Sequence, residues 1–226
     1  MMRCLCVGAS PEFGDCLAGL VRDYSFDGVY AVDGGYRTLR KADLEPTEVF
    51  GDFDSLGYVP AGADAVFDWH KDFTDMDWAL SHALEGGFDE VFLVGGLGGR
   101  TDHAIGNLQL MAKYARQGLK VWSFGEDEVV VCLAGGGDLS RLQFSSQAQG
   151  TFSLLPHSDV VEGVIEEGLE WELSGARLTN SELLGISNEF KGEPVRVSIG
   201  SGTAWVIFPE SCLPFVTWGA ASDSHD

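Results

Sequence analysis

The 226-residue sequence has no uninterrupted apolar run of the roughly 18 to 20 residues that a membrane-spanning helix needs. The apolar stretch near the N-terminus, residues 3–7, is too short for the hydrophobic part of a signal peptide and instead predicts a first core strand. Because both signals are missing, we expect a cytoplasmic protein that does not bind a membrane.

Basic residues are scarce in this chain. The sequence has 14 lysines and arginines against 35 aspartates and glutamates, a net charge of -21. Nucleic acids are bound mainly through lysine and arginine contacts to phosphates, so nucleic acid is not an expected partner. We interpret most of the acidity as a solvated surface that aids solubility.

Cysteine occurs only five times, an odd number without C-x-x-C spacing. Cys4 and Cys6 alternate within the first apolar run, so they share one face of a strand. A zinc site needs several clustered ligands, and the sequence contains no such cluster. The cysteines are therefore expected to be reduced thiols that act as small apolar residues.

Strand-like and helical segments alternate between residues 3 and 124. This alternation predicts an α/β domain with a mostly parallel, Rossmann-like sheet and right-handed crossovers. The expected strands are 3–7, 29–32, 48–50, 65–67, 90–94 and 120–124, and the expected helices are 13–21, 36–42, 75–84 and 102–117. By helical spacing the core-facing residues are Met76, Ala79, Leu80 and Ala83 in the third helix and Ile105, Leu108, Met111 and Ala112 in the fourth.

The pattern changes after residue 126 to short strand candidates separated by glycine, serine, asparagine and proline. Such a pattern is typical of an antiparallel sandwich or barrel. We therefore expect an α/β domain over residues 1–135, a β-sandwich domain over 136–217 and a disordered tail over 218–226. The predicted strands of the second domain are 129–133, 143–144, 151–155, 169–173, 177–178, 195–199 and 203–208.

Acidic or glycine-rich clusters follow several of the strand-like runs, at residues 33–35, 52–54, 71–77 and 95–103. Because the carboxyl ends of parallel strands line one edge of a sheet, these clusters are expected to meet there. Crowded carboxylates repel one another unless a cation lies among them, and glycine-rich turns expose N–H groups that suit phosphate oxygens. The sequence therefore predicts a site for a metal–phosphate complex.

Two aspartates flank a phenylalanine in the second cluster. If the chain is extended there, the carboxylates of Asp52 and Asp54 point to the same side and can bind Mg²⁺. The alternative is a plain turn in which the aspartates bond to the backbone. Asp33-Gly34-Gly35 has a similar alternative, an ordinary turn between a strand and a helix.

The third cluster lies at the start of a predicted helix. Thr74 is expected to cap that helix, and aspartates in its first turn are favoured by the helix dipole. Asp72 and Asp75 can instead turn toward the metal. Lys71 is predicted to be a surface residue that can reach a phosphate.

The fourth cluster joins a buried strand to a helix and is rich in glycine. Gly98 and Gly99 permit close approach of a ligand to the backbone, and Arg100 supplies a cation for phosphate oxygens. Asp102 can cap the helix or contact the ligand, and His103 can bond locally or contact the ligand. The segment matches neither the P-loop nor the G-x-G-x-x-G signature.

In the second half of the chain, Ser187 and Asn188 are small polar residues beside a glycine. They suit hydrogen bonding to a heteroaromatic ring, although a plain turn is the alternative. Trp171 lies in a strand-like run and is predicted to be a core residue.

The order of these segments resembles the thiamine pyrophosphokinase family. That family has D-G-G, G-D-F-D-S, T-D at a helix start and G-G-x-G-G-R-x-D-H, which correspond to residues 33–35, 51–55, 74–75 and 95–103. Residues 168–173 and 185–188 are similar to the family's thiamine-binding β domain. One departure is Glu167, where the family often has a basic residue.

The resemblance implies a homodimeric enzyme that uses Mg²⁺ and transfers pyrophosphate from ATP to the hydroxyl of thiamine, with thiamine held where the subunits meet. The products are thiamine diphosphate and AMP. It implies catalytic roles for Asp33, Asp54, Asp75 and Arg100, and metal binding by Asp52, Asp54 and Asp75. The implied thiamine contacts are Ser187 and Asn188, and the implied ATP contacts are Gly34, Gly35, Asp72, Thr74, Gly98, Gly99, Arg100, Asp102 and His103.

Three other interpretations are consistent with the residues alone. A glycosyltransferase can hold a nucleotide-sugar through a metal on Asp52 and Asp54, and another pyrophosphokinase can act on a different alcohol, such as a pterin. A nucleotide-binding regulator that has lost catalysis is the alternative without enzymatic activity. Formation of AMP, as against ADP, from ATP and thiamine separates these functions.

Overall fold

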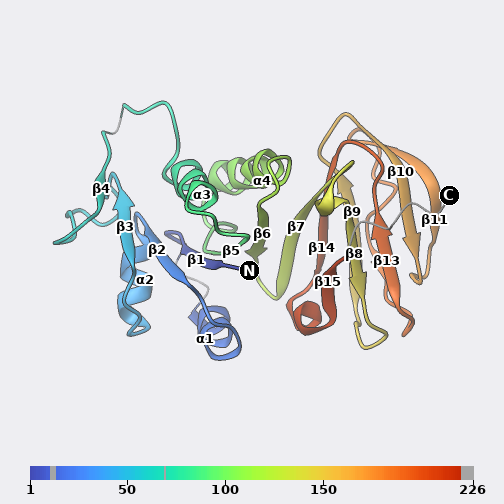
Figure 1. The fold of residues 1–226 in the computed structure, drawn as a ribbon, viewed down its shortest axis with the longest axis horizontal. Helices are drawn as coiled ribbons and strands as arrows, with labels where there is room; N and C mark the ends of the chain where they lie inside the picture. Colours follow the sequence, from blue (N-terminus) through green and yellow to red (C-terminus); the bar gives the residue numbers. More distant parts are fainter. Residues whose placement is uncertain (11–13, 69, 220–226) are drawn as a thin grey trace. The chain divides into compact units, whose positions relative to one another are not determined.

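The computed structural model describes residues 1–10, 14–68 and 70–219 (Figure 1). The chain divides into two compact units. The first contains Met1–Leu110 with Val121–Glu126, and the second contains Met111–Lys120 with the described residues from Asp127 onward. No helix within the described ranges is long and apolar enough to cross a membrane.

The first unit is built on a parallel sheet, as predicted. Strand β1 pairs in parallel with both β2 and β5, and β2–β3 and β3–β4 are parallel pairs. The sheet order is β6-β5-β1-β2-β3-β4. Strands β2, β3 and β4 lie on one side of β1, and β5 and β6 lie on the other, so the direction in which strands are added reverses at β1. The strands are β1 (Arg3–Val7), β2 (Gly28–Val32), β3 (Glu48–Gly51), β4 (Ala65–Val66), β5 (Glu90–Val94) and β6 (Lys120–Phe124).

The helices of this unit follow the predicted segments closely. They are α1 (Gly14–Asp23), α2 (Gly35–Lys41), α3 (Asp75–Glu85) and α4 (Thr101–Ala115), whose last residues belong to the second unit. In Figure 1, α1 and α2 lie on one side of the sheet and α3 lies on the other. This arrangement leaves the carboxyl ends of the strands between the two layers of helices, where ligands of open α/β sheets bind.

The predicted core face is confirmed for α3 and only partly for α4. Met76, Ala79, Leu80 and Ala83 are all buried in α3. In α4, Met111 and Ala112 are fully buried, but Ile105 is 54% exposed, so its prediction as a core residue is wrong. The first residues of α4, Thr101–His103, are exposed as well, so this end of the helix does not rest on the core.

The second unit contains two antiparallel sheets, which confirms the predicted sandwich. One has the order β12-β9-β14-β7 and the other β11-β10-β13-β8-β15. Phe144 of β8 contacts Phe152 of β9 and Phe208 of β14, so aromatic rings fill the space between the sheets. The strands are β7 (Glu128–Ala134), β8 (Arg141–Phe144), β9 (Thr151–Pro156), β10 (Val160–Glu167), β11 (Leu173–Thr179), β12 (Asn188–Glu189), β13 (Val195–Ser198), β14 (Thr203–Pro209) and β15 (Val216–Trp218).

Several strands of the second unit differ from the prediction. Strand β10 was not predicted, because its glutamates interrupt the apolar pattern and Gly163 has a left-handed φ of 66° at an irregular register. The predicted strand 169–173 is wrong: Leu169 forms only an isolated bridge, and β11 begins at Leu173. Trp218, predicted as the start of a tail, is the last residue of β15, while residues 220–226 lie outside the described residues.

The tightest backbone contact in the first unit predicts a clear mutational effect. A Cβ atom at Gly35 would lie 1.8 Å from the carbonyl oxygen of Val7, whereas a Cβ at Gly19 of α1 would meet nothing within 4 Å. We expect Gly35→Ala to lower the free energy of unfolding by about 1–3 kcal/mol or more, since backbone must move. Gly19→Ala should raise it by about 0.5–1 kcal/mol through helix propensity. Urea unfolding of both variants tests this, and equal midpoints would contradict the close contact.

Candidate active site

Three aspartates meet at the carboxyl edge of the first unit's sheet. Asp33 follows β2, and Asp52 and Asp54 follow β3. One carboxylate oxygen from each lies within 4.8 Å of the others. Asp33 and Asp52 are half-buried and Asp54 is exposed. The expected convergence of carboxylates from separate strand ends is therefore present.

The backbone that brings them together differs from the extended chain that we expected. Phe53 has a left-handed φ of 59° and is only 2% exposed, so the phenyl ring turns inward between the two aspartates. Asp33 is also left-handed, with φ of 49°, and its N–H donates to the carbonyl of Phe50 at 2.9 Å. A Cβ at Gly51 would lie 2.9 Å from the Cα of Asp33, so glycine is needed where these strand ends touch. Left-handed residues other than glycine cost free energy and are concentrated at functional sites.

Asp33 is the most constrained of the three carboxylates. Burial raises its pKa, hydrogen bonds from Ser55 and Gly34 oppose that rise, and the nearby charges of Asp54 and Asp52 add to it. Among the described residues, its Oδ1 atom is buried without a hydrogen-bond partner. A buried carboxylate oxygen that lacks a donor is stabilised by a cation. These oxygens therefore fit a divalent metal ion with a preference for oxygen ligands.

A lysine connects this cluster to helix α3. The ammonium group of Lys71 lies 2.8 Å from Asp52 Oδ2 and 2.7 Å from Asp75 Oδ1. Its side chain is only 10% exposed and lies near the rings of Phe67 and Phe73, at 5.2 and 6.0 Å. The prediction that Lys71 is a surface residue is wrong. Two features of the sequence could have indicated a partly buried, paired lysine: Lys71 lies four residues before Asp75, and it lies between Phe67 and Phe73 in the chain.

The pKa values of the two carboxylates that share this ammonium shift in opposite directions. At Asp52 burial raises the pKa, but the hydrogen bond from Lys71 and backbone N–H donors lower it overall. At Asp75 burial raises the pKa and outweighs the lowering by Lys71. Burial lowers the pKa of Lys71, but its two carboxylate partners raise it overall. The lysine therefore stays charged and offsets part of the repulsion at the sheet edge.

The start of α3 confirms the predicted cap. The hydroxyl of Thr74 accepts a hydrogen bond from the N–H of Asp77 at 3.1 Å. Asp72 is exposed just before it. Asp75, in the first helical turn, lies close enough to Asp33 and Asp52 for their charges to raise its pKa. Among the described residues, however, the group of three oxygens includes Asp33 and not Asp75.

The glycine-rich loop leaves β5 beside β1. Gly95 has φ of 73°, and a Cβ there would lie 2.9 Å from the carbonyl of Gly8. Asn107, which is buried, donates from Nδ2 to the carbonyl of Gly96 at 2.6 Å and fixes the base of the loop. Gly98 and Gly99, with φ of 88° and 64°, are exposed at its tip. The loop therefore has a fixed base and an accessible tip.

Arg100 and Asp102 form a bidentate pair at the end of this loop. Arg100 Nε lies 3.1 Å from Asp102 Oδ1, and Nη2 lies 2.6 Å from Oδ2. The hydrogen bond from Arg100 lowers the pKa of Asp102 to about 2. Both side chains are mostly exposed, at 72% and 65%, and His103 beside them is exposed too. Because a pair this exposed contributes little stability, the guanidinium can exchange its partner.

In the second unit, Asn188 is buried, and its side chain bonds to the backbone of Trp171. Its Nδ2 donates to Glu166 Oε2 at 2.9 Å and to the carbonyl of Trp171 at 2.7 Å, and its Oδ1 accepts from the N–H of Trp171 at 3.1 Å. Trp171 is 59% exposed, so its prediction as a core residue is wrong. Ser187 is exposed and left-handed, with φ of 58°, and its N–H donates to Ser153 Oγ at 3.0 Å.

Glu166 is a buried acid that the sequence did not single out. It is 1% exposed, and burial raises its pKa to about 7 despite the hydrogen bond from Asn188. Its position inside a run of glutamates concealed it, because neighbouring Glu167 and Glu162 are exposed. The roles of Ser187 and Asn188 in ligand binding stay predictions.

Both units match known protein-family models. The model described as "Thiamin pyrophosphokinase, catalytic domain" matches residues 25–123, and the model described as "Thiamin pyrophosphokinase, vitamin B1 binding domain" matches residues 140–204. A thiamine pyrophosphokinase of Bacillus subtilis is 32% identical over 166 residues, covering 70% of this chain and 76% of that protein. Thiamine pyrophosphokinase 2 of Arabidopsis thaliana is 27% identical over 177 residues, covering 72% and 65%.

Solved structures show the same similarity. The crystal structure of thiamine pyrophosphokinase from Bacillus subtilis superimposes with a TM-score of 0.74 at 26% identity, covering 92% of this chain and 98% of that one. The crystal structure of thiamin pyrophosphokinase from Geobacillus thermodenitrificans gives 0.73 at 28% identity, covering 94% and 100%. The glycosyltransferase and pterin interpretations receive no support from these matches.

Removing the shared lysine tests the electrostatics of the site. We expect Lys71→Met to lower the free energy of unfolding at neutral pH by about 1–3 kcal/mol, since two partly buried carboxylates lose their cation. The folded pKa of Asp52 is lowered, so its stabilising effect is present above the unfolded value of 3.8 and is lost as pH falls through the folded pKa. The difference from wild type in urea unfolding should therefore shrink below pH of about 4.

Lys41→Met is the matched control for this experiment, because Lys41 is an exposed lysine of α2 outside the aspartate cluster. It should change the unfolding midpoint little at any pH. Equal midpoints for the Lys71 and Lys41 variants at neutral pH would show that the shared ammonium does not stabilise the site.

Proposed function

Because the chain belongs to the thiamine pyrophosphokinase family, we propose that it transfers a pyrophosphoryl group from ATP to the hydroxyl of thiamine. The products are thiamine diphosphate and AMP. The observation that carries this proposal is the group of Asp33, Asp52 and Asp54, with carboxylate oxygens within 4.8 Å of one another at the carboxyl edge of the sheet. Such a group suits a metal-bound triphosphate.

Asp33, Asp52 and Asp54 are the residues that would hold Mg²⁺. Their oxygens are close together, and Oδ1 of Asp33 is buried without a partner among the described residues. When bound, Mg²⁺ neutralises charge on the phosphate oxygens. Asp75, which the sequence suggested as the third ligand, is paired with Lys71 and instead takes a positioning role in this proposal.

The reaction needs positioning and charge neutralisation more than covalent chemistry. The hydroxyl oxygen of thiamine forms a bond to the β-phosphorus, and the bond from that phosphorus to the oxygen bridging to the α-phosphorus breaks. AMP leaves with the electron pair of that bond, and the hydroxyl proton passes to a carboxylate or to water. Asp75, half-buried beside the aspartate cluster, orients the hydroxyl.

The glycine-rich loop contacts the phosphates in this proposal. Gly98 and Gly99 are exposed, so their N–H groups are accessible to phosphate oxygens. Arg100 exchanges its exposed pair with Asp102 for a phosphate, a contact that suits the planar guanidinium. The other proposed ATP contacts are Gly34, Gly35, Asp72, Thr74, Asp102 and His103.

Thiamine is proposed to bind the second unit beside Ser187. The Ser187 side chain and the ring of Trp171 are exposed, whereas the amide of Asn188 already bonds within the protein. We therefore assign to Asn188 the positioning of the Trp171 segment, and to Ser187 and the indole ring the contacts with the heteroaromatic rings.

A second copy of the chain is the proposed partner for the exposed apolar surface of the second unit. Large apolar side chains are exposed there: Trp171 (59%), Leu183 (67%), Leu184 (64%) and Ile186 (49%). They flank Ser187, so a homodimer that covers them would place thiamine at the subunit interface. A cytoplasmic location stays a prediction, as does the absence of nucleic-acid and membrane partners.

The central test is the product formed from ATP. Wild-type protein with thiamine and Mg²⁺ should release AMP and not ADP, and EDTA should stop the reaction. Asp54→Asn should lower kcat by about 100-fold or more, the usual scale for losing a charge-stabilising group. Asp43→Asn, at an exposed position after α2, is the control and should turn over normally. Normal turnover of the Asp54 variant at saturating Mg²⁺ would rule out its metal role.

The dimer makes a separate prediction about mass in solution. Leu184→Glu places a charge in the apolar surface and should shift the protein from dimer to monomer in light scattering after size-exclusion chromatography. The KM for thiamine should rise in the monomeric variant, because both subunits contribute to the proposed thiamine site. Glu182→Lys, on the same exposed segment, serves as the control. A wild-type protein that is monomeric at the assay concentration would refute the shared site.

A further inference from the structure

Glu166 is a buried acid without a counter-ion. Among the charged residues that the structure describes, only Glu90 and Glu166 are buried, at 5% and 1% exposure. Glu90 is paired with Arg3 at 2.9 Å, whereas Glu166 forms no ion pair within the described ranges. Its Oε1 atom is buried without a hydrogen-bond partner there. Burying a carboxylate in this way costs free energy, which points to a role other than stability.

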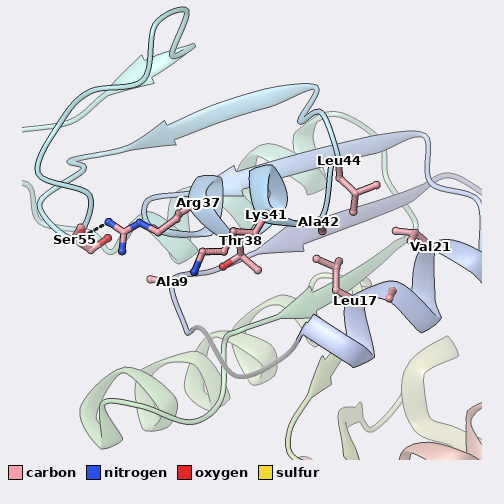
Figure 2. A pocket seen from close by; sticks show the side chains of 11 residues that line it. Ala9, Leu17, Val21, Arg37, Thr38, Lys41, Ala42, Leu44 and Ser55 are labelled. Carbon is pink, nitrogen blue, oxygen red and sulfur yellow. Dashed lines mark hydrogen bonds between the residues drawn. The ribbon is translucent and has the colours of Figure 1, made fainter.

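The charged side chains that line a groove between helices α1 and α2 show the contrast (Figure 2). Arg37 and Lys41 are both exposed, and Arg37 Nη2 donates to the Ser55 carbonyl at 3.1 Å. Because Ser55 also bonds to Asp33, this groove adjoins the proposed metal site and belongs to it. Glu166 lies in the second unit, and the proposed reaction gives it no task.

The side chain of Glu166 is bonded to Asn188, whose own amide is fully occupied. Asn188 Nδ2 donates to Glu166 Oε2 at 2.9 Å and to the Trp171 carbonyl at 2.7 Å. Its Oδ1 accepts from the N–H of Trp171 at 3.1 Å and from the N–H of Glu189 at 2.9 Å. An amide has two donor hydrogens and two acceptor lone pairs, and all four are used here. Since a carboxylate only accepts, Glu166 fixes which end of the amide faces it.

Asn188 takes the place of a backbone partner for Trp171. The preceding residue, Glu170, donates its N–H to the carbonyl of Glu189 at 3.0 Å. At Trp171 the side-chain amide of Asn188 bonds both the N–H and the carbonyl. The Trp171 backbone is thus held by one side chain, while its indole ring is exposed. The place of the ring therefore depends on the orientation of that amide.

We propose that Glu166 is a positioning residue, which orients the Asn188 amide and thereby holds the Trp171 indole ring for the pyrophosphate acceptor. This inference rests on the proposed function, in which the indole contacts the rings of thiamine, and deepens it by naming the acid that sets the place of the indole. A deprotonated Glu166 makes a charge-assisted hydrogen bond to Asn188, which is stronger than the bond to a neutral acid. The affinity for thiamine therefore depends on the protonation of a residue that does not touch it.

The protonation of Glu166 changes near neutral pH. Burial raises its pKa to about 7, and the hydrogen bond from Asn188 opposes that rise. The other charged groups on β10, β11, β12, β13 and residues 168–172 are all exposed: Glu162, Glu167, Glu170, Glu172, Arg177, Glu189 and Arg196. Because water and salt screen exposed charges, burial and the amide bond set this pKa.

Glu166→Gln tests the role, because glutamine keeps the shape and an acceptor oxygen but cannot ionise. We expect the wild-type KM for thiamine to fall about three- to tenfold from about pH 6 to about pH 8, the difference between a neutral and a charge-assisted hydrogen bond. In Glu166→Gln the KM should stay near the wild-type value at the lower pH, and kcat should change little. Glu162→Gln, at an exposed position of the same strand, is the control and should keep the wild-type profile.

Stability separates positioning from simple packing. The folded pKa of Glu166 is raised above the unfolded value of 4.5, so this acid lowers the stability of the folded state as pH rises from 4.5 through about 7. Glu166→Gln avoids this loss, so its urea midpoint should exceed that of wild type at about pH 8 and approach it at about pH 5. The variant should then be more stable and yet bind thiamine more weakly, whereas a loss of packing lowers both.

Hydrogen exchange at the Trp171 amide, followed by NMR, needs no turnover. In Glu166→Gln this amide should exchange about three- to tenfold faster than in wild type at about pH 8, and equally fast at about pH 6. Each comparison is made at one pH, because intrinsic exchange itself depends on pH. Glu162→Gln should exchange as wild type does.

Two results overturn the positioning role: parallel pH profiles of the KM for thiamine in wild type and Glu166→Gln, or equal Trp171 exchange in the two proteins at about pH 8. The proposed function fails separately, if Trp171 exchange responds as expected but wild-type protein releases no AMP from ATP and thiamine.

Discussion

Repulsion among carboxylates at one edge of the sheet is the constraint on which the rest of the site depends. Asp33, Asp52 and Asp54 bring oxygens within 4.8 Å of one another, and Asp75 adds a further charge nearby. Lys71 offsets part of this charge by touching Asp52 and Asp75 from a largely buried position. Oδ1 of Asp33 is buried without a hydrogen-bond partner among the described residues. The cluster therefore has the charge and the oxygen atoms that suit a cation.

The backbone at this edge is held in conformations that ordinary residues avoid. Asp33 and Phe53 are left-handed, and glycine at position 51 lets the ends of β2 and β3 touch. The phenyl ring of Phe53 is buried in the core, which holds that turn in place. Strained residues of this kind persist only where surrounding packing determines them, so the core of the first unit also sets the positions of its carboxylates.

Cations are few in this acidic chain, and their positions divide the first unit into regions of different charge. Lys71 belongs to the aspartate cluster, while Arg37 and Lys41 lie on helix α2. Arg100 stands at the glycine-rich loop in an exposed pair. In the proposed function, acidic groups of this unit hold the metal and basic groups contact the phosphates of a metal-bound nucleotide.

The alternation of strands and helices, the parallel sheet and the meeting of aspartates from β2 and β3 could be predicted from the sequence, because hydrophobic period and strand-end position are local properties. Three features could not be predicted and depend on the three-dimensional packing: Lys71 is largely buried, Asp33 and not Asp75 completes the group of three, and Trp171 is exposed. Strand β10 was missed for a related reason, since its glutamates and bulge hide the apolar alternation. Burial and side-chain partners depend on segments distant in the chain, and no local pattern specifies which of them come into contact.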